Sequence, residues 1–120
     1  MIKKIEAKAI DWKTQEGVEG AYLSYVITHE DFKDMGLTMY RTHKLEFDIT
    51  YTYSEIFLVL AGQLKITTEG KTHVFNRGDI GFVKKGTKAH VESPDISETF
   101  CVTHPALTDE LLEAAFAGEA

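Results

Sequence analysis

The feature that most constrains the fold is a series of short strand-like segments separated by glycine-containing turns, over residues 37–103. Threonine, tyrosine, phenylalanine, isoleucine and valine fill these segments, and such residues favour β-strands. Two of the segments, 64–68 and 71–75, flank the pair Glu69-Gly70, which is typical of a two-residue hairpin turn. Many short antiparallel strands in a small chain predict an all-β sandwich or barrel.

The length of 120 residues predicts a single domain, 1–120. We expect N-terminal strands and loops over 1–36, a barrel core over 37–104 and a C-terminal helix over 107–117. Thr108 is a typical helix N-cap, and Leu112 and Phe116 share one face of the helix at a spacing of four. A helix this short is marginal in isolation, so its apolar face is expected to dock on the barrel or on a partner.

The charge balance argues against a nucleic-acid ligand. Thirteen basic residues against nineteen acidic ones give a net charge of −6, and no basic stripe is visible. The longest apolar run, 56–61, is too short to span a bilayer, and no apolar signal segment follows Met1. The single cysteine, Cys101, cannot form an internal disulfide, which favours a reducing compartment. We therefore expect a cytoplasmic protein without nucleic-acid or membrane partners.

The stretch 50–62 carries the candidate site. In a strand, residues two apart share a face, so Tyr51, Tyr53 and Glu55 are expected to point the same way. We expect these three side chains to line the water-filled entrance of a pocket. The alternative is structural, since tyrosines often fill cores and a lone glutamate can bond to a neighbouring backbone or arginine. After Glu55 both faces of the strand are apolar, which indicates a strand covered on both sides. A homodimer is the resulting hypothesis.

The spacing of glycines around Glu55 resembles the cupin superfamily. Glu55 followed by Gly62 matches the end of the first cupin motif, and Gly78-Asp79 with Gly86 matches the frame of the second. Within that superfamily the chain resembles the cupin domain of ethanolamine-utilisation EutQ proteins. The segments that carry this resemblance are Tyr53-Ser54-Glu55-Ile56, Val59-Leu60-Ala61-Gly62, Glu69-Gly70-Lys71-Thr72 and Gly78-Asp79-Ile80 with Phe82-Val83-Lys84-Lys85-Gly86. The resemblance implies a double-stranded β-helix, or jelly-roll β-barrel, with a short C-terminal helix.

The chain departs from metal-binding cupins at the ligand positions. The positions that hold histidines in those cupins fall here on Ile49 and Tyr51, or with the longer spacing on Asp48 and Thr50, and on Ala89. His90 is one residue away from the last of these positions, so in a regular strand it points to the opposite face. Only Glu55 of the usual four ligands is present, and one carboxylate does not hold Fe, Mn, Ni or Zn. EutQ-like domains share this departure.

Three other residues are candidates for ligand binding near the pocket mouth, namely Arg41, His43 and His104. Arg41 and His43 share a face of the strand that precedes the tyrosines, and His104 closes the last strand. A displaced metal site built from Glu55, His43 and His104 remains an alternative, although no pair among them has the tight spacing of common metal motifs. No cofactor is assigned, and a divalent metal belongs only to this alternative.

These observations lead to one primary expectation and two rivals. The primary one is a EutQ-like cupin whose polar pocket binds a small molecule, in ethanolamine or related small-metabolite catabolism. In an enzyme, Glu55 would transfer the proton while Tyr51 or Tyr53 stabilises an oxyanion, which suits an isomerase, epimerase or lyase acting on a sugar or carbonyl compound. The rivals are a metal-dependent version of this enzyme and a non-catalytic accessory module that only orients a ligand.

Overall fold

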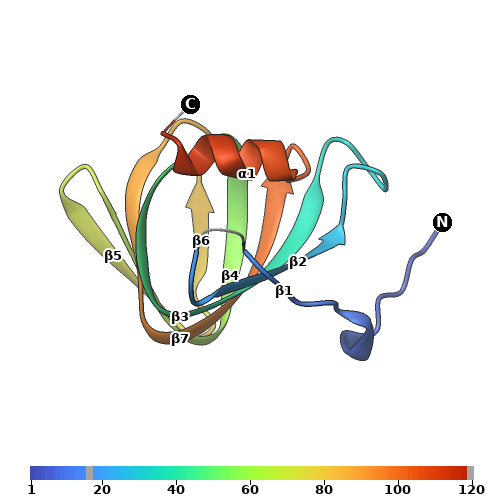
Figure 1. Cartoon of the computed structure of the whole chain (residues 1–120), viewed down its shortest axis with the longest axis horizontal. Helices are drawn as coiled ribbons and strands as arrows, with labels where there is room; N and C mark the ends of the chain where they lie inside the picture. Colours follow the sequence, from blue (N-terminus) through green and yellow to red (C-terminus); the bar gives the residue numbers. More distant parts are fainter. Residues whose placement is uncertain (16–17, 119–120) are drawn as a thin grey trace.

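Three long, bent antiparallel strands build most of the structure, a computed structural model that describes residues 1–15 and 18–118 (Figure 1). These strands are β3 (Gly36–Thr50), β4 (Ser54–Thr68) and β7 (Lys88–His104). The remaining elements are a 3-10 turn (Ala7–Ala9), β1 (Lys13–Thr14), β2 (Ala21–Ile27), β5 (Lys71–Asn76), β6 (Ile80–Val83) and α1 (Asp109–Phe116). The strands curve around one end of a barrel, and α1 lies across the other end (Figure 1).

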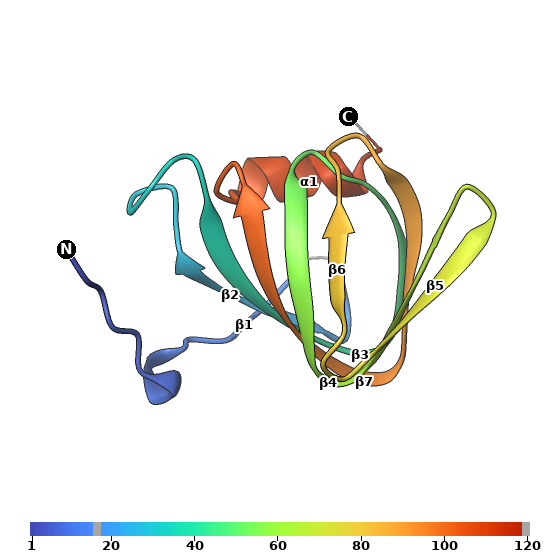
Figure 2. The same cartoon turned by 180° about the vertical axis from the view of Figure 1, so that it is seen from behind.

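The strands form one antiparallel sheet in the order β1-β2-β3-β7-β4-β5, and β6 pairs with the other edge of β4. The last strand, β7, is therefore held between β3 and β4 along most of its length. Figure 2 shows β4 and β6 side by side on the wall opposite the chain's N-terminal strands. The architecture confirms the expected all-β jelly-roll barrel with a short C-terminal helix, and the Glu69-Gly70 hairpin is formed as expected.

Strands β3 and β4 can contribute to both walls of the barrel because each is interrupted by an irregular residue. In β3 the register with β7 shifts between His43 and Leu45, and Lys44 between them has a φ of +48°. In β4 the register shifts on both sides of Gly62, whose φ is +73°. A side chain at Gly62 would overlap the backbone carbonyl of Ile96, so this corner requires glycine.

Helix α1 docks on its own barrel. Its N-cap, Thr108, accepts a hydrogen bond from the Leu111 backbone N–H at 3.2 Å, and the Thr52 hydroxyl donates to the Leu111 carbonyl at 2.6 Å. Leu112 is buried, and Phe116 meets the ring of Phe47 edge-on with a centroid distance of 5.1 Å. Among the described residues, no helix is long and apolar enough to cross a membrane.

One expectation about the strand that carries the candidate site is wrong. The sequence pattern predicts a single strand from Thr50 onwards, but β3 ends at Thr50 and β4 begins at Ser54. Tyr51 instead pairs with the turn between β6 and β7, where its N–H donates to the Thr87 carbonyl at 2.9 Å and its carbonyl accepts from the Gly86 N–H at 2.7 Å. Because of these bonds and the bond between Thr52 and helix α1, residues 51–53 do not pair with a neighbouring strand of the sheet.

Candidate functional site

The barrel encloses a cavity of about 60 Å³ between its strands and helix α1. Leu112 and Phe116 of the helix line one end of it, and the inner faces of β3, β4 and β7 line the rest. Among the described residues, Glu55 is the one charged side chain in this lining. Such a volume holds a few water molecules or one ligand with few non-hydrogen atoms.

Tyr51, Tyr53 and Glu55 all line this cavity, although the segment that carries the tyrosines is not a strand. Tyr51 and Tyr53 keep only 4% and 3% of their surface exposed, and their rings meet at nearly right angles with centroids 5.6 Å apart. Burial, and secondly the charge of Glu55, raises the pKa of both phenols well above its usual value. Both phenols therefore stay neutral at physiological pH.

Glu55 lies at the start of β4, where the ladder places it between β6 and β7. Burial raises its pKa from 4.5 to about 7, and a hydrogen bond with the Cys101 thiol offsets part of that rise. Burial likewise raises the pKa of Cys101 well above its usual range. Near neutral pH the Glu55 carboxyl is thus divided between its acid and ionised forms, which is the condition in which a side chain exchanges protons most readily.

A second polar group in the lining consists of small hydroxyl side chains that the sequence analysis did not single out. The hydroxyls of Thr42 and Ser97 are hydrogen-bonded to each other, and the Ser93 hydroxyl lies 3.2 Å from that of Ser97 and 2.9 Å from the Asp95 carbonyl. Thr99 continues this lining along β7. The alternation of small hydroxyl residues at every second position of β7 is the signal that would have indicated them.

Arg41 and His43 do not line the cavity, because their side chains lie on the outer face of β3. The Arg41 Nε lies 2.9 Å from a Glu98 carboxylate oxygen, and its guanidinium lies 4.0 Å from the centre of the Trp12 ring. The His43 Nε2 lies 3.7 Å from an Asp95 carboxylate oxygen on the same outer surface. The structure therefore does not bring these two residues together with the tyrosines and Glu55.

His104 lies in a separate outer groove of about 300 Å³. Its Nδ1 contacts the backbone carbonyl of Asp34, and the groove is otherwise mostly apolar, with Ile56 and Phe82 in its lining. Glu55 lines this groove as well as the inner cavity, and among the residues that the structure describes it alone belongs to both linings. His104 and Glu55 thus line the same groove.

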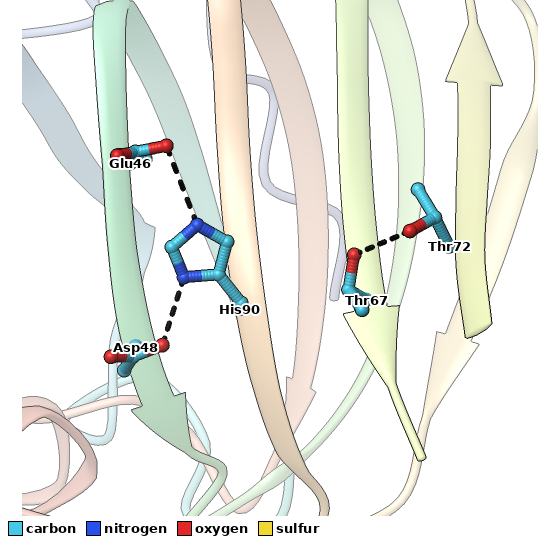
Figure 3. A network of polar contacts seen from close by, with 5 residues as sticks. All are labelled: Glu46, Asp48, Thr67, Thr72 and His90. Atoms are coloured by element: carbon cyan, nitrogen blue, oxygen red, sulfur yellow. Dashed lines mark hydrogen bonds and ion pairs between the residues drawn. The ribbon is translucent and has the colours of Figure 1, made fainter. Parts of the chain in front are cut away.

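His90 points away from the cavity, as its position beside the expected ligand site predicts. Its neighbours Ala89 and Val91 are buried, while its ring lies between Asp48 and Glu46 on the outside of the barrel (Figure 3). Nδ1 lies 2.8 Å from an Asp48 oxygen and Nε2 lies 3.5 Å from a Glu46 oxygen. The hydrogen bond with Asp48 is the main cause of the raised pKa of His90.

The displaced metal site does not assemble in the part of the chain that the structure covers. Among residues 1–15 and 18–118, no three histidine, cysteine, aspartate or glutamate side chains are grouped so that they could hold a metal ion. Glu55, His43 and His104 therefore do not form such a group. The hypothesis of a metal-dependent enzyme therefore has no set of metal ligands among these residues.

Comparison with known proteins places this geometry in context. The family model for "Ethanolamine utilisation protein EutQ" matches residues 2–110. Acetate kinase EutQ from Clostridioides difficile is 30% identical over 105 residues, which are 88% of this chain and 66% of that protein. The corresponding Salmonella typhimurium protein is 27% identical over 107 residues. The chain spans 47% of its length, so it covers only part of either relative.

Solved structures agree on the fold. A putative ethanolamine utilization protein Q from Salmonella typhimurium superposes with a TM-score of 0.81 at 27% identity, covering 88% of both chains. An RmlC-like cupin from Shewanella frigidimarina superposes with a TM-score of 0.74 at 16% identity, covering 88% of this chain and 93% of the other. At that identity the second likeness shows the cupin fold alone.

Proposed function

The chain belongs to the EutQ family of ethanolamine utilisation proteins, and from this premise we propose that its barrel cavity binds a small polar metabolite. One observation carries the proposal: Tyr51, Tyr53 and Glu55, which bear two neutral phenols and one carboxyl group, line the same cavity. Buried polar groups in proteins are nearly always hydrogen-bonded. A ligand or ordered water in the cavity would provide hydrogen-bond partners for these groups.

The same groups suit proton-transfer chemistry. Glu55, with a pKa of about 7, can take a proton from a carbon next to a carbonyl group and return it. Tyr51 or Tyr53 can donate a hydrogen bond to the oxygen that becomes negative in the process. In this form of the proposal the protein is an isomerase, epimerase or lyase, and Glu55→Gln abolishes its turnover. If the protein is instead a non-catalytic binding module, neither the wild type nor Glu55→Gln shows turnover.

The acetate kinase activity named for the relatives is not part of the proposal for this cavity. Acetate and phosphate are anions, and within the described residues the lining contains no lysine, arginine or histidine to hold them. The proposal does include a cytoplasmic location, which the free and buried thiol of Cys101 supports.

The pocket is tested by replacing one phenol. Titration with acetamide, a small neutral probe, is expected to shift the ring NMR signals of Tyr51 and Tyr53. Tyr53→Phe removes one hydrogen bond of about 1 kcal/mol and should weaken binding roughly fivefold. Tyr22→Phe is the matched control, since that ring lies on the outer surface with 44% of its area exposed. Probe binding that leaves both inner tyrosines unshifted would contradict the proposal.

We further propose that the protein self-associates through the outer face of β4 and β6. Ile56 and Phe82 are paired across these strands and keep 54% and 66% of their surface exposed, which is unusual for neighbouring large apolar side chains. Phe82→Asp should convert a dimer into a monomer in sedimentation equilibrium. Tyr22→Asp, a comparable change on the distant strand β2, should leave the dimer intact. A mass that Phe82→Asp does not change would refute this surface.

A further inference from the structure

The charge of the cavity lining restricts what the cavity can hold. Within the described residues Glu55 is its one ionisable carboxyl group, and no basic side chain lines it. Arg41, which lies between the lining residues Tyr40 and Thr42 of β3, is exposed and pairs with Glu98. The cavity is therefore neutral or singly negative, depending on the state of Glu55. Burying an anion there, without a cationic partner, would cost several kcal/mol.

The remaining lining favours a positive charge. Tyr40, Tyr51 and Tyr53 contribute three phenol rings to the wall, and the faces of such rings attract cations, especially where water is excluded. The Tyr40 hydroxyl bonds to Gln15, so what this residue offers the cavity is its ring. The phenolic oxygens of Tyr51 and Tyr53 and the carboxylate of Glu55 supply acceptors for hydrogen bonds. An ammonium group carries three donors and no acceptor, which matches this set.

We infer that the ligand of the barrel cavity is a small protonated primary amine, held by the carboxylate of Glu55 and enclosed by the rings of Tyr51, Tyr53 and Tyr40. The inference rests on the proposed function, since it names the class of ligand that the same cavity takes. The cavity volume of about 60 Å³ limits the amine to a few non-hydrogen atoms. The small hydroxyls of Ser97 and Thr99 would face the rest of the molecule.

Binding of such an amine is coupled to the ionisation of Glu55. The other titratable groups that share its cavity, Tyr40, Tyr51, Tyr53 and Cys101, all have raised pKa values and remain neutral at physiological pH. On its outer side Glu55 shares the groove with His104 and Asp34. With a Glu55 pKa of about 7, roughly a tenth of the carboxyls are ionised at pH 6 and nine tenths at pH 8. Amine affinity should therefore rise about tenfold between these pH values.

The experiment compares three probes of similar size and different charge, namely ethylammonium, ethanol and acetate. Each is titrated into the whole protein at pH 8 while the ring NMR signals of Tyr51 and Tyr53 are followed. Ethylammonium is expected to bind at least tenfold more tightly than ethanol, and acetate is expected not to bind. Glu55→Gln should weaken ethylammonium binding at least tenfold and should weaken ethanol binding much less, because a neutral probe does not depend on the charge at position 55. Glu30→Gln, which changes an exposed carboxylate, should alter neither.

The possible results distinguish the inference that the ligand is an amine from the proposal that the cavity binds a small polar molecule. Binding of ethanol as tight as that of ethylammonium, with no effect of Glu55→Gln, would overturn the inference and leave the polar pocket standing. Tighter binding of acetate would also overturn it. If no probe, acetamide included, shifts the signals of Tyr51 and Tyr53, the pocket itself is refuted. Ethylammonium binding that is independent of pH between 6 and 8 would show that Glu55 is not its partner.

Discussion

Replacement of Glu55 by glutamine is expected to make the protein more stable above pH 7, by about 2–3 kcal/mol. The folded state raises the pKa of this carboxyl from 4.5 to about 7, mainly through burial. Below pH 4.5 the group is neutral in both the folded and unfolded states and has no effect on the free energy of unfolding. As the pH rises from 4.5 to 7 the unfolded chain ionises first, so the wild-type protein loses stability over this window. Glutamine does not ionise and avoids that loss.

Urea denaturation at pH 5 and pH 8 tests this prediction. The difference between Glu55→Gln and wild type should be below about 1 kcal/mol at pH 5 and should reach its full size at pH 8. The charged form of His90 also affects how stability depends on pH. Because its pKa is raised in the folded state, His90 stabilises the fold below pH 6.5, and this contribution is lost as the pH rises. That contribution is present in both proteins and cancels in the difference. A difference that is the same at the two pH values would show that Glu55 ionises freely in the folded protein.

A carboxyl that lowers stability at neutral pH calls for a functional explanation. An amide or an apolar side chain at this position would carry no ionisation cost above pH 7. Natural proteins retain such costs mainly where a site needs the group. The stability measurement therefore bears on function even before a ligand is identified.

Gly62→Ala is expected to destabilise the protein by at least about 3 kcal/mol. Gly62 has a φ of +73°, which costs an alanine about 1–2 kcal/mol by itself. In addition, the new Cβ would overlap the carbonyl of Ile96, a backbone atom that cannot rotate away. Relieving this overlap would require β4 to separate from β7 at the corner where both strands bend.

Gly70→Ala is the matched control for this prediction. Gly70 has nearly the same φ, +75°, but nothing lies within 4 Å of the position where its Cβ would be. Only the conformational cost applies, so the expected loss is about 1 kcal/mol in urea denaturation. Equal losses in the two variants would show that the close approach of Ile96 does not constrain the corner.

The fold could be predicted because its signals are local. The Glu69-Gly70 turn, the Thr108 N-cap and the glycines around β6 each specify a short piece of backbone, and the pieces agree with one architecture. The glycine at position 62 belongs to the same set, although its reason, the contact with Ile96, becomes visible only in three dimensions. Agreement among independent local signals is what makes a fold readable from a single sequence.

The site was less predictable because it depends on where strands change register. The expectation placed Arg41 and His43 at the pocket mouth, yet on β3 the inward residues before Lys44 are the even-numbered ones, such as Tyr40 and Thr42. After Lys44 the inward positions become odd-numbered, as at Phe47. Nothing in the local sequence marks this one-residue shift, and a single shift exchanges the two faces of a strand.

Glu55 lines both the inner cavity and the outer groove, at a point where β4 is paired with β6 on one side and with β7 on the other. At this point the barrel wall between the two spaces is a single strand thick. A substitution at position 55 therefore changes both surfaces at once. Because Ile56 and Phe82 also line the groove, the effects of such a variant on ligand binding and on self-association have to be measured separately.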